Sequence, residues 1–189
     1  MIDTDFYQNV FIELSERFIK RQGLQDLIWF LQTSDFFVAP CSTKYHLSEK
    51  GGLCLHSINV FNALAELVKH YKIEDANRET LAIVSLFHDI CKVNTYKEAL
   101  KWQKNESNEW EQVPYFTFAE DFPFGHSEKS VFLISQYMHL TPYEAQAINA
   151  HMGFSDIRGA NLIGNMFTKN KLGVLLHFAD MTATYFMED

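Results

Sequence analysis

A histidine and an aspartate stand side by side at the end of an apolar run, and a lysine follows three residues after the aspartate. The run covers residues 81–87, the pair is His88 and Asp89, and the lysine is Lys92. An ionised carboxylate among apolar side chains costs several kcal/mol unless a cation or hydrogen-bond donors surround it. A bound metal ion would satisfy both side chains of the pair, and so would a buried hydrogen bond.

Four further side chains of the same chemical types occur in segments with helical spacing before and after the pair. They are His56, His126, His151 and Asp180. Imidazole and carboxylate without thiolate are typical of hydrolytic or oxygenase sites for Mn, Fe, Co, Ni or Zn, rather than of structural zinc sites. The three cysteines show no Cys-x-x-Cys spacing, so neither a disulfide framework nor a thiolate zinc site is indicated.

These residues, in this order, resemble the HD-domain metal-dependent phosphohydrolases, in the variant that carries two metal ions. Residues 51–57, Gly-Gly-Leu-Cys-Leu-His-Ser, are similar to the family's GGLLEHS segment, and residues 88–92, His-Asp-Ile-Cys-Lys, are similar to its HDIGK segment. Further segments look like those of bacterial and phage-associated HD proteins, around His126, His151 and Asp180. The resemblance covers residues 37–186 and departs from the family at Cys91, where the pattern has a small residue.

The resemblance implies a division of the ligands between two metal ions. The first ion would be held by His56, His88, Asp89 and Asp180. The second ion would be held by the bridging Asp89 together with His126 and His151. A metal-bridging hydroxide would be the nucleophile, because two cations lower the pKa of a water and neutralise phosphoryl oxygens. The expected cofactors are two divalent transition metal ions, Mn, Fe, Co or Ni before Zn or Mg.

Two lysines are candidate catalytic residues beside Asp89, because an ammonium can hold a nonbridging phosphate oxygen. Lys92 follows Asp89 by three residues, and Lys129 stands one helical turn after His126. Either lysine could instead compensate the charge of a helix end, and this alternative stays open for both.

The resemblance implies hydrolysis of a small phosphorylated substrate, a phosphomonoester or phosphodiester such as a nucleotide or a nucleic-acid strand end. Two alternatives fit the same ligand pattern. One is a di-iron oxygenase, since myo-inositol oxygenase and a phosphonate oxygenase share it. The other is a non-catalytic HD module that binds a nucleotide and signals through a partner, although such modules usually lose ligands and all six are present here.

Composition sets the outer limits of these hypotheses. The chain has 189 residues, of which 47% are hydrophobic and 17 are Phe, and we expect residues 1–189 to form a single domain. The net charge of −8 argues against a protein that coats long nucleic acid through a basic face. There is no basic leader and no apolar run near the roughly 18 residues of a membrane span, so we expect a cytoplasmic protein without a membrane partner.

The elements that must position these side chains are expected to be helices, in an all-α, orthogonal bundle of about seven helices. Residues 1–34 should form N-terminal packing helices, and residues 95–118 should form an inserted β-hairpin. The apolar spacing of residues 81–88 predicts a buried helix that extends through His88. Lysines of the hairpin and Trp102 could contact substrate, or the hairpin could be a plain surface ribbon.

The remaining segments border the predicted site. Residues 33–52 should form an ordered loop over the pocket, with His46 within reach of a substrate. A helix should run from His126 to residues 139–140, and Thr141 and Glu144 should form a capping box that starts the next one. Residues 153–170 are predicted to be a loop, and residues 172–186 a helix with His177 beside the ligands.

Overall fold

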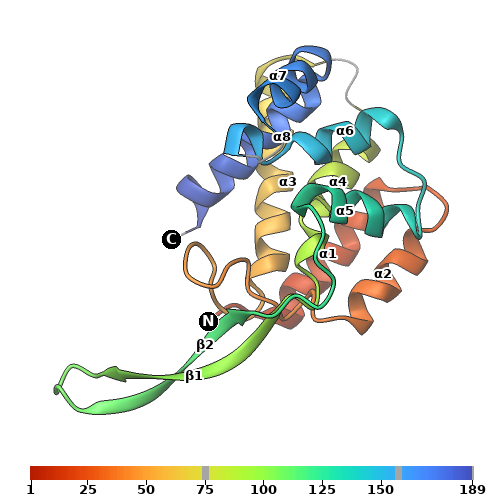
Figure 1. Ribbon diagram of the computed structural model, residues 1–189. Coiled ribbons are helices and arrows are strands. Elements are labelled where there is room, and N and C mark those ends of the chain that lie inside the picture. Colours follow the sequence, from red (N-terminus) through yellow and green to blue (C-terminus); the bar gives the residue numbers. More distant parts are fainter. Residues whose placement is uncertain (74–76, 156–158, 189) are drawn as a thin grey trace.

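The computed structural model describes residues 1–73, 77–155 and 159–188, and most of these residues lie in helices (Figure 1). The α-helices are α1 (Thr4–Phe18), α2 (Leu24–Thr33), α3 (Gly52–His70), α4 (Arg78–Leu86), α5 (His126–Ser135), α6 (Pro142–Ala150), α7 (Ala160–Lys169) and α8 (Lys171–Thr182). The predicted all-α class is therefore confirmed, with eight α-helices in the described residues where about seven were expected. Assignment of the whole chain to one domain stays a prediction.

The core is built around α4, whose residues from Leu81 to Leu86 are all buried. Phe11 of α1 contacts three further phenylalanine rings edge-on, with centroids 5.0–5.8 Å apart, in Phe36, Phe37 and Phe87. Edge-to-face contacts add to the free energy of burying each ring. This aromatic cluster joins α1 and the segment after α2 to the residue that precedes His88, so it fixes the position of the histidine-aspartate pair.

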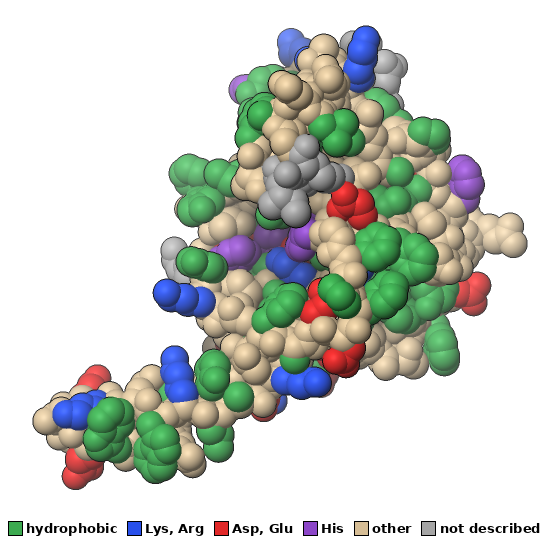
Figure 2. All heavy atoms as spheres, viewed as in Figure 1, with side chains coloured by type: hydrophobic (Ala, Val, Ile, Leu, Met, Phe, Trp, Pro, Cys, Tyr) green, Lys and Arg blue, Asp and Glu red, His purple; other side chains and the backbone are tan. Residues whose placement is uncertain are grey.

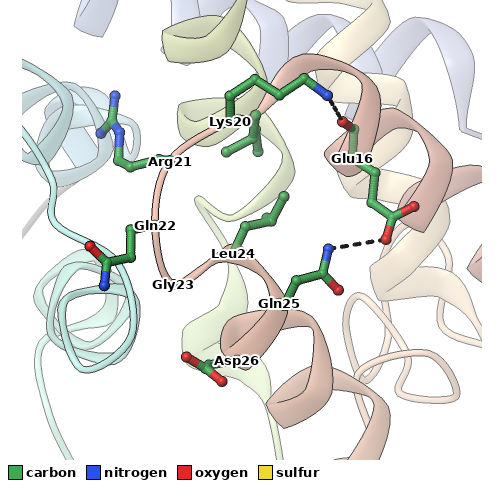
Figure 3. Close-up of a pocket in the computed structure, with 9 residues that line it drawn as sticks. Glu16, Lys20, Arg21, Gln22, Gly23, Leu24, Gln25 and Asp26 are labelled. Atoms are coloured by element: carbon green, nitrogen blue, oxygen red, sulfur yellow. Dashed lines mark hydrogen bonds between the residues drawn. The ribbon is translucent and has the colours of Figure 1, made fainter.

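The turn between α1 and α2 depends on Gly23. Its φ of 91° is in the left-handed region, and a Cβ there would lie 1.9 Å from the carbonyl oxygen of Tyr137. Figure 3 shows the cavity at this turn, with a volume of about 340 Å³, and the bond from Gln25 to the Glu16 carboxylate. The candidate ligands do not line this cavity, so we assign it a structural origin.

The predicted capping box at the start of α6 is present, because the Thr141 and Glu144 side chains each bond the other's backbone N–H. The buried Glu144 carboxylate also accepts hydrogen bonds from Arg21, at 2.6 and 3.0 Å, and from the Thr80 hydroxyl at 2.9 Å. One carboxylate thus joins α6 to the α1–α2 turn and to α4. This matters for the site because α6 ends at His151.

Two sequence-based helix boundaries were wrong. Helix α4 ends at Leu86 and does not include His88. In an α-helix two successive side chains point about 100° apart, so His88 and Asp89 could not both be directed at one site. In the turn that follows α4, both side chains face the same point. Helix α5 ends at Ser135 rather than at residues 139–140.

The predicted loop over residues 153–170 contains helix α7. Its glycines and asparagines favour loops, but the buried Ile163 gives the helix a packing face against its neighbours. Asp156 and Arg158 of this segment lie outside the described residues. Residues 183–187 continue α8 as a π-helix.

The predicted hairpin consists of β1 (Tyr96–Lys104) and β2 (Trp110–Phe118), which pair antiparallel from Tyr96 opposite Phe118 to Lys104 opposite Trp110. Its turn uses Asn108 with a positive φ of 64°, which asparagine tolerates. The hairpin extends away from the helices (Figure 1). Among the described helices, none has the length and apolar character to cross a bilayer.

Candidate metal centre

Six side chains of metal-ligand type meet at one place although they come from five separate segments. They are His56 of α3, His88 and Asp89 of the turn after α4, His126 at the start of α5, His151 at the end of α6 and Asp180 of α8. Potential ligand atoms lie within 4.8 Å of one another in the group His56, His88 and Asp180, and in the group His88, Asp89 and His151. The structure therefore brings together all six residues singled out by the sequence.

His88 is held in one orientation by the end of α4. Its Nδ1 lies 2.7 Å from the Ser85 carbonyl oxygen, so Nδ1–H donates that bond and Nε2 carries a lone pair. Burial lowers the pKa of His88 to about 4, and the imidazole is neutral at pH 7. Among the described residues, Nε2 has no hydrogen-bond partner, and it is buried. A lone pair in this situation is what a metal ion requires of a histidine ligand.

His151 repeats this arrangement at the end of α6. Its Nδ1 lies 2.6 Å from the Ile148 carbonyl oxygen, and its Nε2 is directed to Asp89, 3.6 Å from Oδ1. His177 bonds the backbone carbonyl of His151 at 2.7 Å. Gly153 follows with a positive φ, and a Cβ there would lie 2.4 Å from the His177 ring. His177 thus supports the segment that carries His151.

Asp89 lies at the centre of the group, and its two oxygens face different partners. Oδ1 is 2.8 Å from His126 Nε2 and 3.6 Å from His151 Nε2. Oδ2 is 3.6 Å from His88 Nε2, 3.8 Å from His56 Nε2 and 2.7 Å from the Lys92 ammonium. One carboxylate therefore stands between two sets of imidazoles, which is the geometry a bridging ligand needs.

The charges around Asp89 favour its ionised form. Burial by itself raises the pKa of this carboxyl, but Lys92 and the neighbouring imidazoles outweigh burial and hold the pKa well below its usual range. Lys92 keeps its proton for the reciprocal reason, since Asp89 outweighs the effect of burial on the ammonium. The 3-10 turn Ile90–Lys92 brings Lys92 onto the same side as Asp89, because residues three apart are eclipsed in such a turn.

His56 has a partner that sequence reasoning missed, the carboxylate of Glu188. Both carboxylate oxygens lie close to His56 Nδ1, at 3.0 and 3.1 Å, and Asn59 donates a further bond to Glu188 at 3.0 Å. On its other side, His56 Nε2 lies 3.2 Å from Asp180 Oδ1. A carboxylate behind a histidine orients the ring and raises its basicity toward a metal. No local motif marks Glu188, because it is 132 residues from His56.

The loop of residues 34–51 lies beside the centre, where it was predicted. Cys41 Sγ is 3.2 Å from His46 Nε2 and 3.5 Å from the Lys92 ammonium. Burial raises the pKa of Cys41, but His56 and Lys92 outweigh burial and lower the pKa to about 6. His46 thus contacts Cys41, a residue that the sequence pattern did not single out, and its reach to a substrate stays a prediction.

Two residues near α5 add detail to the predictions. Lys129 is buried, and its ammonium forms an ion pair with Glu120, so the structure gives it a structural partner. Cys91, the departure from the family pattern, is buried with Sγ 3.4 Å from His126 Nδ1. Burial raises the pKa of the Cys91 thiol to about 12, and the neutral thiol packs behind the His126 ring.

The centre is reached from one face of the molecule. The His126 side chain is 35% exposed and that of Asp180 is 22% exposed, whereas His56, His88 and His151 are buried. Figure 2 shows histidine side chains and a basic side chain gathered in a hollow on this face. A solvent-borne substrate could therefore approach Asp89 from the side of His126 and Asp180.

The donor set fits divalent transition metals. Four imidazoles and two carboxylates surround the point, and the unpaired Nε2 of His88 is directed into it. Imidazole and carboxylate suit Zn, Fe, Co, Ni and Mn, and a buried nitrogen lone pair without a hydrogen-bond donor costs free energy that a bound cation would offset.

The comparisons with known proteins agree with this geometry. A family model described as HD domain matches residues 55–181, which is more than half of the chain and includes all six side chains. No curated protein and no solved structure shows a significant match.

Proposed function

Because this chain belongs to the HD domain family, a superfamily of metal-dependent hydrolases, we propose that it is a phosphohydrolase with two divalent metal ions. The observation that carries the proposal is the position of Asp89 between two sets of imidazoles. The imidazoles of His56 and His88 face Asp89 Oδ2, and the Asp180 carboxylate joins them through its contact with His56. The imidazoles of His126 and His151 form the other set, which faces Asp89 Oδ1.

When bound, two such ions polarise a phosphoryl oxygen and supply a hydroxide nucleophile near neutral pH. The chain's own residues do the positioning. Backbone carbonyls fix the rings of His88 and His151, and Glu188 fixes the ring of His56. The buried histidines also exclude bulk water from one side of Asp89, which strengthens every charge interaction there.

Lys92 is the residue that we propose for charge stabilisation during phosphoryl transfer. Its ammonium is 2.7 Å from Asp89 Oδ2, and its side chain is 16% exposed. A cation fixed there before the reaction stabilises negative charge that develops on a phosphoryl oxygen. Lys129 was the other candidate, but its ion pair with Glu120 favours Lys92.

The net charge of the protein bears on the substrate class. The protein carries a net charge of −8, so attraction of an anionic substrate has to come from the metal ions and the local lysine. We propose a phosphomonoester or phosphodiester of nucleotide size, or the end of a nucleic-acid strand.

The test combines metal analysis with an activity panel on one preparation. Protein purified without oxygen should contain close to two transition metal ions per chain, or bind them from Mn, Fe, Co or Ni salts. The loaded protein should hydrolyse members of a panel of nucleotides and aryl phosphate mono- and diesters without consuming oxygen.

Two results would contradict the proposal. Protein that stays metal-free after reconstitution with each metal would remove the centre itself. Oxygen uptake coupled to turnover of an alcohol or a phosphonate would identify a di-iron oxygenase instead.

A further inference from the structure

The β-hairpin formed by β1 and β2, here called the arm, leaves the body directly beside the metal centre. β1 begins four residues after Lys92, and the chain that leaves β2 leads to His126. The root of the arm is closed by a bond of 2.8 Å from the Ala119 N–H to the Thr95 carbonyl. Tyr96 at the root donates a hydrogen bond of 3.5 Å to the Cys41 carbonyl. A polymer bound along the arm would therefore have one end at the centre.

One face of the arm carries large apolar side chains that the body does not cover. Paired residues of an antiparallel ribbon point to the same side, so the register places four exposed side chains on one face: Leu100, Trp102, Trp110 and Phe118. Each of them is 61–64% exposed. Trp110 is opposite Lys104, which is two residues after Trp102 on β1. Trp102 and Trp110 are therefore diagonal neighbours on this face. Contiguous exposed apolar side chains of this kind indicate an interaction surface.

Cations accompany the aromatic rings. The Lys104 ammonium lies on the same face as the tryptophans, 5.6 Å from the centre of the Trp110 ring. Lys97 and Lys101 lie on the opposite face of the ribbon, where the Lys101 ammonium is 5.5 Å from the centre of the Tyr115 ring. The one acidic residue of β1, Glu98, pairs with Lys50 at 2.8 Å. Figure 2 shows hydrophobic and basic side chains close together along the arm.

We propose that the arm binds single-stranded nucleic acid whose end enters the metal centre, an inference that rests on the proposed phosphohydrolase function. Bases stack on exposed aromatic rings, and the Lys104 ammonium beside Trp110 neutralises a phosphate of the same strand. Each strand of the arm has nine residues and is about 30 Å long, enough for several nucleotides. The acidic side chains Glu106, Glu109 and Glu111 lie at the turn end, so the bound strand follows β1 from the root to Lys104.

A second copy of the chain fits this surface less well. An identical arm packed face to face would bring a second Lys104 ammonium near the first, and like charges would repel. A nucleic-acid strand supplies anionic phosphates for Lys104 and planar bases that stack on the tryptophan rings.

The tryptophans allow a direct test of where the strand binds. The chain has three tryptophans, two on the arm and Trp29 on α2, which is 65% exposed. In a Trp29→Phe background, fluorescence therefore reports from the arm alone. Addition of an unstructured oligonucleotide of about ten nucleotides, within the range of about 4–16 for such sites, should quench this fluorescence. The metal-loaded protein and low salt should be used.

Variants then identify the residues that carry binding. Trp102→Ala and Trp110→Ala should each weaken the affinity for the oligonucleotide roughly tenfold in anisotropy titrations. The matched control Trp29→Ala should bind like the wild type. Changing Lys104 to Gln should lower the slope of log affinity against log salt by roughly 0.7, the value for one phosphate contact of a single strand, whereas Lys101→Gln on the opposite face should change the slope less. Melting temperatures should be unchanged, since these side chains are exposed.

Three results would overturn the inference. They are an absence of quenching, an affinity that is insensitive to the arm variants, and a dimer in solution that Trp102→Ala dissociates, which would identify a second copy as the partner. Hydrolysis of bis(p-nitrophenyl) phosphate separates this inference from the proposed function. If that substrate is cleaved while the oligonucleotide does not bind, the arm proposal fails and the hydrolase stands.

Discussion

Replacing Glu188 by Gln tests how far a side chain outside the predicted ligand set controls the metal centre. The carboxylate lies 3.0 and 3.1 Å from His56 Nδ1, and its side chain is fully buried. Burial raises the pKa of Glu188, but His56 outweighs burial, and the pKa is held below its usual value. The group behind His56 is therefore a full negative charge. An amide of the same size keeps a hydrogen-bond acceptor there but removes that charge.

The expected result is a weaker metal site on an intact fold. Loss of such a partner weakens metal affinity about 10- to 100-fold, which corresponds to about 1.4–2.7 kcal/mol. Because His88 and His151 are held by backbone carbonyls, the variant leaves their orientation unchanged, and the loss should fall on the site that contains His56. Glu188→Ala should weaken that site further, because the ring is then no longer held in place.

Affinity can be measured by competition between the protein and a chromophoric chelator for Co²⁺, without any substrate. The exposed Glu66 on the same helix as His56 supplies a matched control, and Glu66→Gln should bind like the wild type. Circular dichroism melting of the metal-free proteins checks the fold. Equal Co²⁺ affinities for wild type and Glu188→Gln would refute the reasoning, because they would show that the carboxylate does not act on His56.

Four other changes have defined expected outcomes. Asp89→Ala should remove most of the bound metal, measured by elemental analysis, since both sets of imidazoles share this carboxylate; retention of both ions would contradict the bridging role. Lys92→Met should lower kcat about 10- to 1000-fold with metal content unchanged, and a near-native kcat with a lower melting temperature would instead indicate a structural lysine. Arg21→Gln should lower the free energy of unfolding in urea by about 1.5–3 kcal/mol, because it leaves the buried Glu144 carboxylate without its cation, whereas the exposed Arg78→Gln should not. Metal affinity should rise with pH. Although burial opposes the charged form, Cys41 and Asp180 raise the pKa of His56 and Asp89 raises that of His151, so protons compete with the metal ion up to a higher pH than they would at a free imidazole. A metal affinity that does not change between pH 6 and 8 would contradict this.

Local sequence signals were sufficient for much of the fold. The capping box at Thr141 acts within a few residues, and it is present as predicted. The hairpin could be predicted for the same reason, since two runs that are rich in aromatic and β-branched residues flank a short Asn- and Ser-containing turn. The ligand types were readable because imidazole and carboxylate within apolar helices are costly without partners.

What the sequence missed depends on contacts between distant segments. Glu188 reaches His56 across 132 residues, and Lys92 contacts Cys41 across 51, so no spacing rule relates them. The end of α4 was misplaced because the apolar pattern continues through Phe87 into a turn that packs like a helix. Helix α7 was missed because packing of Ile163 overrides the weak helix propensity of its one glycine and two asparagines.

The position of the hairpin in the chain also bears on how the centre assembles during folding. Asp89 and His126 are 37 residues apart in sequence, but pairing of β1 with β2 shortens the loop between them to roughly 15 effective residues. By the logarithmic dependence of closure entropy on loop length, this lowers the entropic cost of joining the two residues by about 0.8 kcal/mol. Hairpins form in about 1–10 μs, so the two ligands can be close together before the last helices dock.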